Sequence, residues 1–195
     1  MDYFRYAGGE LHVEDVPVAR LAEEHGTPLY VYSARTIVEH HRKLRDAFAG
    51  GSPLVCYSVK ANSNLSILKL MKDDGAGFDV VSGGELLRAL RVGADPQKIV
   101  FAGVGKTDEE ISLALRTGIL LFNIESEEEL ANIDRLAALA GRTATAALRI
   151  NPDVDPQTHT YIATGKKETK VGVDLDRARG ILSRAVAPFH GRVPF

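Results

Sequence analysis

The fold of this chain is decided by the run LVCYSVK at residues 54–60. Side chains alternate between the two faces of a strand, so this run has one bulky face and one face that stays small until its last residue. The bulky face consists of Val55, Tyr57 and Val59, and the other face consists of Cys56, Ser58 and Lys60. The first is suited to packing under helices, and the second to a barrel interior into which one amine projects.

Four further strand-like runs follow, separated by segments with the apolar spacing of helices. They cover residues 78–82, 99–103, 119–124 and 145–150. Two intervening helices are predicted to begin with capping boxes, Thr107 with Glu110 and Ser126 with Glu129, and a later helix is expected to start near Asp174. This strict alternation predicts a parallel α/β sheet.

The repeat fits either an open doubly wound sheet or a (β/α)8 barrel, and its length does not separate them. A complete barrel takes about 250 residues. The barrel alternative therefore predicts a partial (β/α)8 TIM-type barrel of about five βα units, with a sixth strand beginning near residues 192–195.

Residues 1–53 do not follow the repeat. Strands are predicted at residues 10–13 and 29–32, and helices at 18–24 and 37–48. We expect this piece either to join a second structural unit or to cover the barrel from outside.

The composition excludes several classes of protein. Hydrophobic residues make up 45% and the formal net charge is -2, so there is no basic surplus for nucleic acid or an anionic membrane. The N-terminus lacks a signal-peptide pattern, which favours a cytoplasmic location. Cys56, the single cysteine, is expected in the core, and the spacing of the six histidines predicts no metal site.

Lys60 is the first candidate for chemistry, because lysine fits poorly in a buried strand. It lies at the carboxyl end of the strand, where active sites of parallel α/β folds gather, and a desolvated amine there could form a Schiff base. The alternative is a lysine just past the strand that reaches solvent. Asp79 and Arg149 hold comparable positions, either for a charged ligand or as a structural ion-pair network. Glu85 begins a predicted helix, where the dipole favours a carboxylate.

Two other motifs bear on function. The string GVGKT at residues 103–107 is similar to the end of a phosphate-binding P-loop, but Val100 stands where that loop needs glycine, so nucleotide binding is not expected. The polar segment 151–172, which contains His159, is long enough to predict a functional or mobile loop.

Several strings together resemble the alanine-racemase-like, fold-type III pyridoxal-phosphate decarboxylases. They are CYSVKAN at 56–62, FDVVSGGEL at 78–86, NIESEEEL at 123–130, RINPDVD at 149–155, THTYIATG at 158–165 and KETKVG at 167–172. The last three look like the diaminopimelate-specific branch rather than the ornithine or arginine branch. One departure is Val171, where the family usually has phenylalanine.

The resemblance implies a barrel domain at residues 34–195 and an N-terminal segment, 1–33, that contributes to a separate β-rich domain. It implies that Lys60 binds pyridoxal 5'-phosphate, that Asp79, Glu85 and Arg149 lie near this cofactor, and that His159 and Lys170 belong to a substrate or lid loop. The full-length family member is expected to be a homodimer acting on a small amino acid.

The implied activity is the decarboxylation of meso-2,6-diaminopimelate to L-lysine and CO2, the last step of lysine biosynthesis. Other family blocks are not found in the 195 residues, so little or no activity is expected of this piece alone. The alternatives are an ornithine, arginine or carboxynorspermidine decarboxylase, a non-catalytic pyridoxal-phosphate-binding protein, and an inactive remnant.

Overall fold

A five-stranded parallel sheet forms the centre of the computed structural model, which describes residues 3–48, 50–151, 172–174 and 177–181. The strands are β4 (Cys56–Ser58), β5 (Gly77–Val80), β6 (Ile99–Phe101), β7 (Leu121–Ile124) and β8 (Ala146–Leu148). They pair in the order β4-β5-β6-β7-β8, which is also their order in the chain. A doubly wound sheet reverses its strand order at a switch point, whereas a barrel does not. The predicted partial barrel is therefore confirmed.

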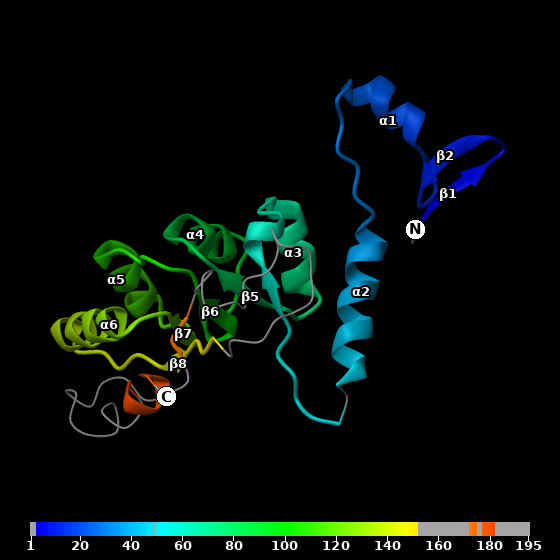
Figure 1. Cartoon of the computed structure of the whole chain (residues 1–195). Helices are drawn as coiled ribbons and strands as arrows, with labels where there is room; N and C mark the ends of the chain where they lie inside the picture. Colours follow the sequence, from blue (N-terminus) through cyan, green and yellow to red (C-terminus); the bar gives the residue numbers. More distant parts are fainter. Residues whose placement is uncertain (1–2, 49, 152–171, 175–176, 182–195) are drawn as a thin grey trace.

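Four helices cover one face of this sheet, and consecutive helices pack against each other along the outside of the strands (Figure 1). They are α3 (Leu65–Asp73), α4 (Gly83–Arg91), α5 (Asp108–Thr117) and α6 (Glu127–Ala140), with short 3-10 helices η1 (Val59–Ala61) and η2 (Pro96–Lys98) in the connections. The core lies between these layers, where Phe78, Phe101 and Phe122 are almost fully buried. Their strand neighbours Asp79, Val100 and Asn123 consequently face the other side.

Local sequence fixes where the helices begin. The Thr107–Glu110 capping box is present as predicted at the start of α5. At α6, Ser126 accepts a hydrogen bond from the Glu129 amide, but the Glu129 carboxylate binds the Glu125 amide instead of closing the box. Asp174 caps the helical residues 177–181 by accepting from the Arg177 amide, which confirms the predicted start.

The N-terminal part forms a separate antiparallel sheet and two helices. Its strands are β1 (Phe4–Ala7), β2 (Glu10–Val13) and β3 (Val16–Pro17), and its helices are α1 (Val18–His25) and α2 (Ala34–Ala47). The strand predicted at 29–32 is wrong: this stretch has no strand partner among the described residues, and Tyr30 is 85% exposed. A β-type sequence without a partner strand cannot satisfy a ladder of hydrogen bonds.

Some expectations concern residues outside the described part of the chain, namely those for His159, Lys170, Val171 and the sixth strand at 192–195. Ile150 and Val173 form an isolated parallel bridge, which brings the two ends of the long loop together. Within the described residues, no helix combines the length and apolarity needed to cross a membrane.

Candidate functional site

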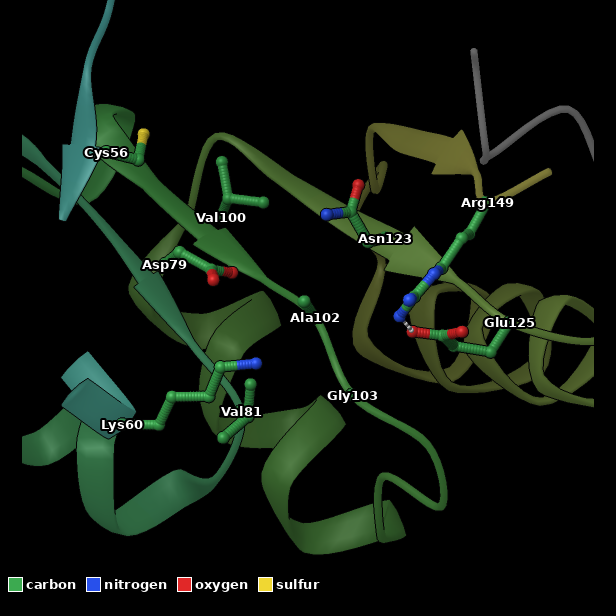
Figure 2. Close-up of a pocket in the computed structure, with 10 residues that line it drawn as sticks. All are labelled: Cys56, Lys60, Asp79, Val81, Val100, Ala102, Gly103, Asn123, Glu125 and Arg149. Carbon is green, nitrogen blue, oxygen red and sulfur yellow. Dashed lines mark hydrogen bonds and ion pairs between the residues drawn. The ribbon is translucent and has the colours of Figure 1, made fainter. Parts of the chain in front are cut away.

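A cavity of about 520 Å³ lies on the inner side of the sheet, toward the carboxyl ends of its strands (Figure 2). All five strands contribute to it, either directly or through the residues that follow them. Its lining consists of Cys56, Lys60, Asp79, Val81, Val100, Ala102, Gly103, Asn123, Glu125 and Arg149. Three pairs of these residues, 79 and 81, 100 and 102, and 123 and 125, alternate with buried residues that pack under the helices, so the period of two seen in the sequence places them on one surface.

Lys60 extends into the cavity from η1, not from the strand itself. β4 covers only Cys56–Ser58, so the extended run predicted at 54–60 is two residues too long at each end. The Tyr57 hydroxyl donates to the Asn62 carbonyl oxygen at 3.1 Å, which closes the turn under the lysine, and Val59 is fully buried. The turn therefore presents the amine at the rim of the sheet.

Asp79 stands beside Lys60 on β5, where it is in register with Ser58 of β4. The Ser58 hydroxyl donates to Asp79 Oδ2 at 3.1 Å, which orients the carboxylate. Cys56 lines the same wall and is half-buried, so the expectation of a core cysteine is wrong. Burial, and then the charge of Asp79, raise the pKa of the Cys56 thiol, which keeps it protonated at neutral pH.

Arg149 lies across the cavity from Lys60 and Asp79, directly after β8. Its Nη1 donates to Glu125 Oε1 at 3.1 Å. The Glu125 side chain is only 4% exposed, whereas that of Arg149 is 46% exposed. The cavity thus has a cation and a carboxylate on each side.

Glu85 does not line this cavity. Its carboxylate accepts the Val81 amide at 2.9 Å and its own amide is bound by Ser82, so it holds the turn into α4. Its connection to the cavity runs through the backbone of Val81, which does line it.

Glu125 and Asn123 are polar residues of the site that the sequence did not single out. The alternation along residues 121–125 puts Asn123 and Glu125 on the same face, so the signal was present. The alternation is not decisive, because Glu125 also lies next to the acidic residues that begin α6, where carboxylates are common for another reason.

Lys106, from the string that is similar to a P-loop, has a structural role instead. Its side chain is buried, pairs with Glu129, and donates to the carbonyl oxygens of Gly103 and Asn123 at 2.8 and 2.9 Å. An amine occupied in this way is not available for a phosphate.

The lining fits a flat aldehyde cofactor. Lys60 supplies the amine that an aldehyde requires, and Val81, Val100 and Ala102 supply an apolar wall for a ring. Asp79 and Arg149 supply charges for polar groups, and the buried Glu125 Oε2 still lacks a hydrogen-bond partner among the described residues.

Residues 34–190 match the family model of the pyridoxal-dependent decarboxylases, pyridoxal binding domain. The chain belongs to this family, and its cofactor is accordingly pyridoxal phosphate. Among curated relatives it is similar to the diaminopimelate decarboxylase of Pseudomonas aeruginosa, with 50% identity over 190 residues, which is 97% of this chain and 46% of the relative. The chain therefore spans less than half the length of this relative.

Solved structures of decarboxylases are also similar to this chain. The diaminopimelate decarboxylase of M. jannaschii in complex with L-lysine superimposes with a TM-score of 0.90 at 38% identity, over 99% of this chain and 46% of that one. An arginine decarboxylase of Paramecium bursaria Chlorella virus, bound to agmatine, has a TM-score of 0.70 at 24% identity, over 87% of this chain and 43% of that one. That second likeness shows a shared fold.

Proposed function

We propose that this chain is the cofactor-binding part of a decarboxylase that converts meso-2,6-diaminopimelate to L-lysine and CO2. The observation that carries the proposal is Lys60, an amine projecting at the carboxyl end of the sheet into a cavity with Asp79 and Arg149. The identity of about half of its residues to diaminopimelate decarboxylases favours this substrate over ornithine or arginine.

Each lining residue has a defined task under this proposal. Bound pyridoxal phosphate supplies the electron sink for loss of the carboxyl group. Lys60 Nζ would hold the aldehyde group of the cofactor. The Asp79 carboxylate, oriented by the Ser58 hydroxyl, would offset positive charge on the bound cofactor beside it. Arg149 donates N–H groups to an anionic oxygen, and the apolar wall excludes water.

The remaining assignments of the proposal concern the whole protein. Residues 1–33 contribute to a β-rich domain and residues 34–195 to the barrel. Glu85 supports the cofactor wall through Val81, and His159 and Lys170 act from a lid loop. The complete polypeptide is a cytoplasmic homodimer.

Borohydride trapping tests the cofactor site in the complete polypeptide that carries this sequence. Incubation with pyridoxal phosphate, reduction and peptide mapping should find the label on Lys60. The variant Lys60→Ala should lose it, while Lys69→Ala, which removes an exposed lysine of α3, should keep it. A label distributed over surface lysines would contradict the assignment.

Turnover assays test the substrate. CO2 release from meso-diaminopimelate should exceed release from ornithine, arginine and carboxynorspermidine. A preference for one of the other three would replace the proposed substrate, and labelling of Lys60 without any turnover would indicate a non-catalytic cofactor-binding protein.

A further inference from the structure

Glu125 occupies an unusual position for an acidic residue. It directly follows β7 and lines the cavity. Only 4% of its side chain is exposed. One of its oxygens, Oε1, accepts from Arg149 at 3.1 Å. The other, Oε2, is buried and has no hydrogen-bond partner in the described part of the chain. A buried carboxylate oxygen without a donor is unfavourable unless a group that binds later supplies one.

The backbone of Glu125 is fixed from the side away from the cavity. Its amide donates to Glu129 Oε2 at 3.0 Å, and the other oxygen of Glu129 pairs with the buried Lys106. Lys106 in turn holds the carbonyl oxygen of Asn123 at 2.9 Å. The end of β7 is therefore anchored to the connection before α5, so the backbone from which the Glu125 side chain extends is fixed by contacts outside the cavity.

The backbone of Arg149 is fixed by hydrogen bonds like that of Glu125, but its guanidinium group is held less firmly. Its amide donates to the Ile124 carbonyl at 2.9 Å, and its carbonyl accepts the Val173 amide at 2.8 Å. Its side chain remains 46% exposed and makes one hydrogen bond to Glu125. A guanidinium and a carboxylate can form two parallel bonds, so this pair has room to close from one bond to two through Oε2.

We propose that Glu125 is a positioning residue that aims the Arg149 guanidinium at an anionic oxygen of the bound ligand and offsets its charge. This inference rests on the proposed function of the cavity. The other charged groups that line the cavity, Lys60 and Asp79, lie on the opposite side and leave Glu125 as the carboxylate next to Arg149 (Figure 2).

The test uses the complete polypeptide with three variants. Glu125→Gln keeps the shape and removes the charge, Glu125→Asp keeps the charge on a shorter side chain, and Arg149→Lys removes the fork of donors. Glu109→Gln, in the exposed first turn of α5, is the matched control for loss of one negative charge. The readouts are the Kd of pyridoxal phosphate, the pH at which the visible band of the bound cofactor titrates, and KM and kcat for meso-diaminopimelate.

Glu125→Gln should weaken ligand binding roughly tenfold, the size expected when a hydrogen bond to a guanidinium loses its charged acceptor. The visible band should titrate at lower pH, because an uncompensated positive charge disfavours a protonated form nearby. Glu125→Asp should recover part of both effects, and the double variant with Arg149→Lys should be no worse than Arg149→Lys alone. An effect on the Kd assigns the anionic oxygen to the cofactor, and an effect confined to KM assigns it to the substrate.

Two outcomes would overturn the inference, and they are distinguishable. If the wild type binds pyridoxal phosphate at Lys60 but Glu125→Gln binds and titrates like Glu109→Gln, the positioning role fails while the proposed function stands. If the wild type takes up no cofactor, both fail. Urea unfolding of each variant shows whether a loss of ligand binding comes from misfolding. If Glu125→Gln misfolds, the comparison of Glu125→Asp and Arg149→Lys with the wild type tests the positioning role instead.

Discussion

At the scale of single residues, Gly172 supports the position of Arg149. Gly172 has a φ of +94°, in the region that favours glycine, and a Cβ built there would lie 2.9 Å from the Arg149 carbonyl oxygen and 3.1 Å from its Cγ. The close approach lets the neighbouring Val173 amide bind that same carbonyl. A side chain at position 172 would therefore disturb both the backbone and the direction of the arginine.

We expect Gly172→Ala to lower the free energy of unfolding by about 1–3 kcal/mol, the range for a strained left-handed residue. Gly84→Ala is the matched control, because a Cβ there meets only Ser82 Oγ at 3.8 Å and lies inside α4, where alanine is favoured. Urea denaturation of the complete polypeptide measures both. Equal stability of the two variants would contradict this account.

The sequence predicted individual residues unevenly. Lys60, Asp79 and Arg149 could be singled out because charged residues in apolar strands are rare, and the structure brings all three to one cavity. Glu125 could not be singled out in the same way, because its neighbours are acidic residues that favour a helix start. Its partner, Arg149, becomes evident only when β7 and β8 are paired in register.

At the scale of elements, the helix starts are linked to one another. Glu110 of α5 accepts the Thr107 amide at 3.0 Å, as in a capping box, and also the Gly83 amide of α4 at 2.7 Å. Lys106, just before α5, pairs with Glu129 of α6. The same short segment thus ties three consecutive helices together around the rim of the cavity.

Glu110→Ala should destabilise the protein by about 1–2 kcal/mol, because two amides lose their acceptor. Hydrogen bonds from Gly83 and Thr107 hold the pKa of the Glu110 carboxyl below its ordinary value. Because the pKa of Glu110 is lower in the folded than in the unfolded protein, its ionised carboxylate stabilises the fold at pH values above the unfolded pKa of about 4.3. This stabilisation disappears as the pH falls through the folded-state pKa. The difference from the wild type in urea unfolding should accordingly shrink in acid.

The adjacent variant Glu109→Ala serves as the comparison. Glu109 is exposed in the same helical turn, so its replacement should change stability little at any pH. If Glu109→Ala were as damaging as Glu110→Ala, a general effect of the helix dipole would explain both.

Elements were predictable where their signals are local. The caps at Thr107, Ser126 and Asp174 depend on residues three positions apart, and all three occur. The strand expected at 29–32 failed because strand formation depends on a partner far away in the sequence. The side chain of Glu129 also departed from its expected local role, since a buried lysine from another unit competes for it.

At the scale of the whole molecule, α2 is attached to the barrel through the buried carboxylate of Asp74. Asp74, just after α3, accepts from His41 Nδ1 and from Arg42 at 2.6 Å each, and the Asp74 side chain is 7% exposed. Burial tends to raise the pKa of Asp74, but the hydrogen bonds from Arg42 and His41 outweigh it and lower that pKa overall. The contact therefore depends on an ionised carboxylate.

Asp74→Asn should loosen α2 without unfolding the sheet. Hydrogen exchange at neutral pH should become faster for the amides of α2 than for those of α5, by an amount equivalent to about 1.5–3 kcal/mol. Because the folded-state pKa is lowered, the stabilisation exists above about pH 4 and is lost as the pH falls further. Asp73→Asn, at an exposed neighbouring pair, should leave α2 unchanged.

Residues 1–195 expressed alone should self-associate and decarboxylate meso-diaminopimelate little or not at all. Among the described residues, the outer edge of β4 is unpaired, and an apolar hollow of about 510 Å³ lined by Ile37, Leu44 and Met71 lies beside it. Unpaired edges and exposed apolar surface favour association. Light scattering after size exclusion, with the complete polypeptide as control, measures this, and an active monomeric piece would contradict it.

The architecture was predictable only in part. Alternation of strands and helices gave the parallel sheet, but both a doubly wound sheet and a barrel satisfied it. The distinction lies in strand order, which depends on which strands pair, and β4 through β8 pair in chain order. No local pattern in residues 54–150 encodes that order.

The contacts around the rim also determine where this gene can be recombined with those of its relatives. With a crossover at residues 92–98, Glu110 and Gly83 would come from different parents. Their hydrogen bond would survive, because every residue except proline supplies a backbone amide at position 83. A crossover at 118–120 would separate Lys106 from Glu129, and one at 141–145 would separate Glu125 from Arg149. Functional chimeras should therefore be most frequent with junctions at 92–98, because there each parent keeps its own pairs of charged side chains.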